Sequence, residues 1–63
     1  MLNYSNKLYK KYEVSPDFLG TFIDLAIKQG AKIDAVKDQF DLYDVLILAD
    51  TENIDAIDKI LAK

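Results

Sequence analysis

The pattern of apolar and polar positions is clearest between residues 15 and 29. Ser15 is a favourable N-cap residue, Pro16 suits the first helical turn, and Gly30 follows where a left-handed residue can end a helix. Gly20 lies inside the segment at a cost of about 1 kcal/mol relative to Ala, which either a close backbone crossing explains or the helix simply tolerates. The segment predicts an amphipathic helix, whose continuous apolar face consists of Phe18, Leu19, Phe22, Ile23, Ala26 and Ile27.

Residues 3–13 also carry an apolar stripe at helical spacing. Tyr4, Leu8 and Tyr12 recur every four residues, and the lysines of this segment fall mainly on the other side. A strand over residues 8–14 is the alternative, but it would place Lys10 among the inward-facing Leu8, Tyr12 and Val14. The pattern therefore favours a short amphipathic helix.

Residues 42–49 are the most apolar run of the chain, interrupted only by Asp44. A run of this length fits either a buried helix or a strand. Neither Gly nor Pro occurs between residues 31 and 63, whereas tight hairpins usually contain Gly at the turn. The pattern therefore predicts two helices, one over residues 31–40 and one from residue 42, with a break near Asp41.

The final segment, residues 50–63, again has a helical pattern. Asp50 or Thr51 can cap its start, and Glu52 lies in its first turn. Its apolar stripe consists of Ile54, Ile57, Ile60 and Leu61. Taken together, these segments predict an all-α fold, a compact bundle of four to five short helices forming one small domain over residues 1–63.

An α+β arrangement is the alternative fold. It has strands over residues 32–40 and 43–50, hence a β-hairpin at 32–50, followed by a helix from Glu52. The pair Tyr43–Asp44, which opens an apolar strand leading into an acidic helix start, resembles ligand-sensing domains of the dimeric ferredoxin-like type. This resemblance covers about half of the chain. It implies a ferredoxin-like fragment and a small-molecule-sensing regulatory domain.

The composition removes most enzymatic chemistry. The chain contains neither Cys nor His, so it lacks thiolate metal ligands and the commonest general base. It also lacks a Gly-rich phosphate loop. The carboxylates of Asp34, Asp38 and Asp41 have the spacing of one helical face, which could hold Mg²⁺ or Ca²⁺. An EF-hand loop starting at Asp50 is excluded, because it would need Gly where Asp55 stands. We therefore expect no enzymatic activity, no cofactor and no bound metal.

Charge and size favour association with protein. The net charge is −3 and no Arg is present, which disfavours nucleic acid as a partner. Small domains usually need disulfides, metals or partners for stability, and only partners remain here. The N-terminal segment has no secretory signal, so we expect a cytoplasmic protein without membrane or small-molecule partners.

The sequence thus predicts a non-enzymatic protein–protein interaction or accessory module of the phage or mobile-element type. We expect it to bind a protein partner or itself, as a homodimer or higher oligomer. The expected partner-binding residues are Tyr4, Leu8, Tyr12, Phe18 and Phe22.

Overall fold

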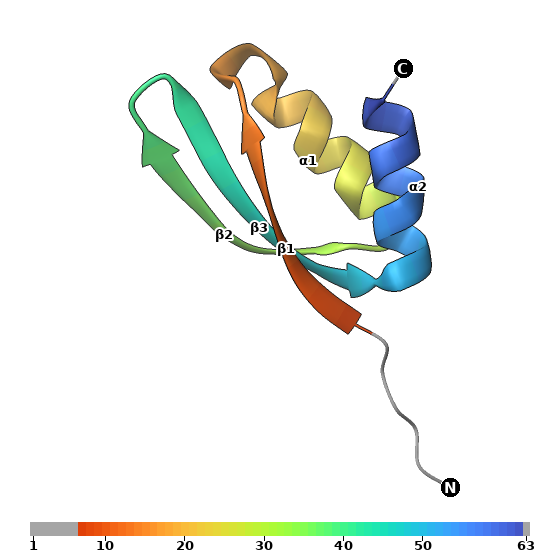
Figure 1. Ribbon diagram of the computed structural model, residues 1–63. Helices are drawn as coiled ribbons and strands as arrows, with labels where there is room; N and C mark the ends of the chain where they lie inside the picture. The colour runs from red at the N-terminus through yellow and green to blue at the C-terminus, as the bar shows by residue number, and fades with distance from the viewer. Residues whose placement is uncertain (1–6, 63) are drawn as a thin grey trace, which may run out of the picture.

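A computed structural model of the chain describes residues 7–62. Its elements in chain order are β1 (Lys7–Val14), a 3-10 turn (Pro16–Phe18), α1 (Leu19–Lys28), β2 (Lys32–Gln39), β3 (Leu42–Asp50) and α2 (Thr51–Leu61). The strands form an antiparallel sheet in the order β1-β3-β2. Both helices lie on one face of this sheet, so the fold has two layers (Figure 1).

The prediction of an all-α bundle of four to five helices is wrong, because the structure is α+β. The β-hairpin expected at residues 32–50 in the alternative arrangement is present as β2 and β3. The element order β-α-β-β-α matches the first five elements of the ferredoxin-like motif. The chain predicted to form a small helical domain therefore forms a sheet covered by two helices.

The apolar run that begins at residue 42 forms β3, the central strand. Val45, Ile47 and Ala49 are buried under the helices, while Leu46 and Leu48 point to the other face and are half-buried. A strand with a neighbour on each side and apolar residues on both faces gives a nearly continuous apolar sequence, which explains the ambiguity of this segment. The rest of the core comes from Val14, Phe22, Ala26, Ala31, Ile54 and Ile57.

The turn between β2 and β3 is made without glycine. Gln39 pairs with Leu42, so the loop consists of Phe40 and Asp41 alone. Phe40 has a φ of 58°, a left-handed conformation that is costly for a bulky side chain. The predicted break near Asp41 is thus present, but it joins two strands and not two helices.

The predicted helix over residues 3–13 is also wrong where the structure describes it, because residues 7–14 form β1. Leu8, Lys10, Tyr12 and Val14 pair with β3 residues on the helix-covered face, which places Lys10 inward as the strand alternative required. Asp58 of α2 accepts a hydrogen bond from the Lys10 ammonium and makes that position tolerable.

Both remaining helix predictions are confirmed. The first helix begins with a 3-10 turn, in which the Phe18 N–H donates to the Ser15 carbonyl at 3.0 Å, and the Ser15 side chain makes no capping bond. Gly30 follows the helix with a φ of 84°, as expected for a left-handed residue. Gly20 has open space where a Cβ would stand, so no close backbone crossing explains it.

Candidate functional site

The two edges of the sheet differ in how they are built. Strand β2 forms one edge, and its pairing with β3 is interrupted by a register shift between Ile33 and Ala35. Strand β1 forms the other edge, and its eight residues pair with β3 without a shift. Within residues 7–62 no strand pairs with the outer side of β1. Bulges are a common protection of sheet edges, so β1 is the less protected edge.

Side chains on β1 alternate between the two faces of the sheet. Those at Leu8, Lys10 and Tyr12 lie on the helix side, opposite β3 residues of the core, while Tyr9 and Lys11 lie on the uncovered side. Helix α2 packs over β1 and β3, and α1 packs over β2 (Figure 1). The β1 edge is therefore bordered by α2 on one side.

A polar cluster connects β1 to α2. The Lys10 ammonium donates to Asp58 Oδ2 at 2.8 Å, and the Tyr12 hydroxyl donates to Asp58 Oδ1 at 2.8 Å. The Lys10 nitrogen also lies 5.1 Å from the centre of the Tyr12 ring. Each oxygen of one carboxylate thus has its own donor from β1.

The contacts within this cluster shift the pKa values of Asp58 and Tyr12. The hydrogen bonds from Lys10 and then Tyr12, together with the charge of Lys10, lower the pKa of Asp58 below its ordinary value of 3.8, and burial opposes this shift. Burial of the phenol, followed by the hydrogen bond to Asp58 and the charge of that carboxylate, raises the pKa of Tyr12 above its ordinary value. Near neutral pH Asp58 is therefore ionised, and the Tyr12 hydroxyl keeps its proton and can donate to it.

Apolar side chains remain exposed beside the same edge. Leu8 on β1 retains 51% of its exposure, and Leu61 at the end of α2 retains 36%. Leu61 follows Asp58 by three residues, so it lies on the side of α2 that Asp58 shares with β1. We call the outer side of β1 together with Leu8 and Leu61 the β1 edge surface.

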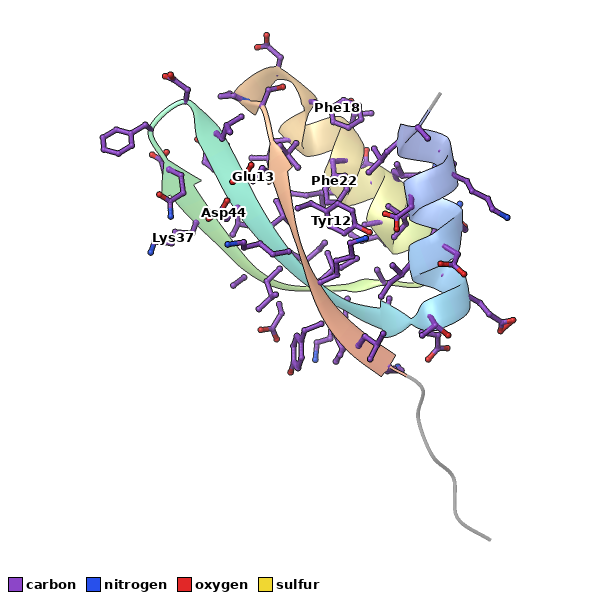
Figure 2. All side chains as sticks on the ribbon, in the orientation of Figure 1. Tyr12, Glu13, Phe18, Phe22, Lys37 and Asp44 are labelled. Carbon is purple, nitrogen blue, oxygen red and sulfur yellow. The ribbon has the colours of Figure 1, made fainter. Side chains whose placement is uncertain are left out.

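The expected partner-binding residues have different environments. Tyr4 lies outside the described residues. Leu8 is on the β1 edge surface, Tyr12 is half-buried, Phe18 is 38% exposed and Phe22 is completely buried. The Tyr12 and Phe22 rings lie 5.0 Å apart, and the Phe18 and Phe22 rings 6.5 Å apart (Figure 2). These aromatic residues form part of the packing between β1 and α1, and Phe22 offers no surface to a partner.

A second feature lies on the uncovered face of the sheet. Asp44 projects there from β3 and is only 14% exposed, and its Oδ1 is buried without a hydrogen-bond partner. Its Oδ2 lies 4.0 Å from the Lys11 ammonium. A shallow hollow of about 300 Å³ surrounds this carboxylate, and Figure 2 shows Asp44 and Lys37 on neighbouring strands. The hollow is lined by Lys11, Ala35, Lys37, Gln39, Asp44 and Leu46.

Neither the Lys10–Asp58 contact nor the hollow around Asp44 is predicted by the local pattern of the sequence. The signal for Asp44 is its position as the single charge in the apolar run 42–49. The Lys10–Asp58 pair joins residues 48 positions apart, and no local pattern connects them. Of the expected residues that the structure describes, Leu8 is the one that is largely exposed.

Two features are absent from the part of the chain that the structure describes: a group of carboxylates for a metal ion and a membrane-spanning helix. Within residues 7–62, no three Asp or Glu side chains come together in a group that could hold a metal ion. In the same range, neither helix has the length and apolar character needed to cross a membrane. The acidic residues between 34 and 58 are instead distributed over β2, the turn that follows it, β3 and α2.

Comparisons with protein-family models, with curated proteins and with solved structures found no match for this chain.

Proposed function

We propose that this chain is a non-enzymatic protein–protein interaction module that binds through the β1 edge surface. The observation that carries the proposal is the eight-residue strand edge, which has no strand partner within residues 7–62 and is bordered by the exposed Leu8 and Leu61. Strand edges present backbone donors and acceptors that another chain can pair with. Adjacent apolar side chains supply the burial that backbone pairing alone lacks.

The energetics support association at this surface. Full burial of a Leu or Ile side chain contributes about 1.5–3 kcal/mol. Leu8 retains half of its exposed area, so covering the remainder would contribute about 1 kcal/mol at that residue alone. A domain of this size has a small core and gains from further burial. The surface therefore offers affinity through backbone hydrogen bonds and further stabilisation through its apolar border.

Analytical ultracentrifugation with matched variants tests the proposal. Leu61→Glu places a charge on the β1 edge surface, and Ile27→Glu places one on α1 at a residue that is 56% exposed. We expect the wild-type chain and the Ile27→Glu variant to associate at high micromolar concentration and the Leu61→Glu variant to remain monomeric. Equal association of all three chains, or a monomeric wild type at every concentration, would contradict the proposal.

The hollow around Asp44 favours a second candidate function, a small-molecule-sensing regulatory domain. Its unpartnered Oδ1 can accept a hydrogen bond from a ligand, and Lys11 and Lys37 can hold an anionic group. Ligand pockets commonly have volumes of about 300–1,000 Å³, and this hollow is at the lower limit. The ligand would be a small compound carrying both an N–H donor and an anion.

Glycine is the smallest probe with both groups. In a heteronuclear NMR titration, binding predicts saturable shifts of the amide signals of Lys11, Lys37 and Asp44. The Asp44→Asn variant keeps the shape of the side chain but removes the carboxylate, and it should abolish those shifts. Unchanged spectra at tens of millimolar glycine would count against this second function and leave the β1 edge surface unaffected.

A further inference from the structure

We infer that the partner at the β1 edge surface is a second copy of this chain, whose β1 pairs antiparallel with β1 so that the two Lys10 residues face each other. This inference rests on the proposed function and names its partner and geometry. The resulting dimer has one continuous sheet of six strands, with the four helices on the same face. Symmetry, register and charge each favour this arrangement.

Symmetry limits the possible registers. A two-fold axis perpendicular to the sheet keeps both helix layers on one side and makes the two β1 strands antiparallel. Residues directly opposite each other must then point to the same face, and faces alternate along a strand. The axis therefore lies midway between a residue and its own copy, which face each other. Within β1, the central choices are Tyr9, Lys10, Lys11 and Tyr12.

Three of these registers are unfavourable. With the axis at Tyr9, Lys7 lies opposite Lys11 twice, and like charges directly opposite each other are destabilising. With the axis at Lys11, two Lys11 side chains face each other, and the nearest carboxylate, on Asp44, is 4.0 Å away. With the axis at Tyr12, only residues 10–14 of each strand pair, and Leu8 remains uncovered.

The axis at Lys10 pairs residues 7–13 of both strands. Leu8 then lies opposite Tyr12 of the partner subunit on the helix side. The Leu8 side chain and the Tyr12 ring of the partner subunit cover each other there. Glu13 lies opposite Lys7 of the partner subunit on the uncovered side, and opposite charges at this spacing are favourable. This register covers the residue of β1 that is both apolar and half-exposed.

Charge at the axis is already balanced inside each subunit. Each Lys10 donates to its own Asp58 at 2.8 Å, so the two ammonium groups bring two carboxylates with them. The same carboxylates accept from Tyr12, which fixes their position beside the strand. Lysines usually protect a strand edge from pairing, but this lysine is directed toward α2 and neutralised there.

Disulfide trapping tests the register, because the chain has no cysteine of its own. Opposite residues in an antiparallel pair have Cα atoms about 4.5–5.5 Å apart, within the range that a disulfide bridges. We expect mild oxidation to convert Lys10→Cys chains to covalent dimers. The Tyr9→Cys and Lys11→Cys chains should stay monomeric on a non-reducing gel, since each residue is two positions away from its copy. Lys37→Cys, on the β2 edge, serves as the control.

A mixed experiment leaves Lys10 and its ion pair intact. Chains carrying Lys7→Cys are mixed with chains carrying Glu13→Cys, because these positions face each other only when the axis is at Lys10. We expect a covalent heterodimer in the mixture in place of two homodimers. This measurement keeps the inference testable should Lys10→Cys weaken the fold.

The outcomes separate the inference from the proposed function. Trapping at Lys11 or Lys37, or a mixture that gives no heterodimer although ultracentrifugation shows a dimer, would overturn the register and leave the interaction module in place. A dimer that no β1 cysteine can trap would overturn the strand pairing. A chain that stays monomeric in ultracentrifugation would overturn both.

Discussion

The Lys10 ammonium and the Asp58 carboxylate lie 2.8 Å apart and connect strand β1 to helix α2. The second oxygen of Asp58 accepts from the Tyr12 hydroxyl, so one side chain on the helix holds two on the strand. Both charged side chains are about two-fifths exposed, and exposed ion pairs contribute little to stability. The importance of this contact is therefore positional: it allows an edge strand to carry a lysine on its covered face.

Removal of the Asp58 carboxylate should destabilise the fold modestly. Asp58→Ala removes two hydrogen bonds to β1, and we expect a loss of about 1–2 kcal/mol in the free energy of unfolding. Urea denaturation of the variant measures this loss. Asp55→Ala, on an exposed position of the same helix, should change the free energy by less than about 0.5 kcal/mol. Equal effects of the two substitutions would show that the contact with β1 is unimportant.

Acid should weaken the fold partly through the same carboxylate. The pKa of Asp58 is lower in the folded chain than its ordinary value of 3.8, so its stabilising contribution is present above that value. The contribution is lost as the pH falls from about 3.8 through the lower folded-state pKa. We expect the Asp58→Asn variant to lose less stability than the wild type over this interval. Parallel acid titrations of both chains, followed by circular dichroism, would contradict the assignment if their slopes were identical.

Gly20 is a position where alanine should stabilise the protein. It lies within α1, and nothing occupies the space that a Cβ on this residue would take. Gly20→Ala should therefore raise the free energy of unfolding by about 0.5–1 kcal/mol, because alanine restricts the unfolded chain more. Gly30→Ala is the matched control and should destabilise, since its φ is 84° and a Cβ there would meet Asn53 at 2.9 Å. Thermal melting distinguishes the two directions.

Phe40 is strained and gains nothing from burial in the isolated chain. Its φ is 58° and its side chain is 98% exposed. Phe40→Gly should stabilise the hairpin by up to about 1 kcal/mol, because the relief of about 1–2 kcal/mol of left-handed strain exceeds the entropic cost of glycine. Denaturation of the variant measures this gain. A loss of stability instead would mean that the Phe40 ring makes contacts that the isolated chain does not show.

The parts of the fold that sequence predicts well are those whose signal is local. The helix after Ser15 and the helix after Asp50 each carry a complete apolar stripe within one element, and Gly30 ends the first. Their patterns do not depend on any other segment. The same is true of the break near Asp41, which residues on both sides of it indicate.

The parts that sequence misassigns depend on distant partners. The spacing of Leu8 and Tyr12 fits a helix and a strand equally, and Lys10 disfavours the strand unless Asp58 supplies a counter-charge from α2. The absence of glycine from the turn disfavours the hairpin, yet the pairing of β3 with two strands outweighs the strain at Phe40. Tertiary contacts override local preference in both places.

Hydrogen exchange at the backbone amides of β1 tests the association of this strand most directly. In an edge strand, alternate amides point away from the sheet and exchange rapidly, while those bonded to β3 are protected. We predict that the outward amides of residues 7–13 become protected at high protein concentration and exchange rapidly on dilution. Outward amides that exchange rapidly at every concentration, while the amides bonded to β3 stay protected, would contradict pairing at the β1 edge.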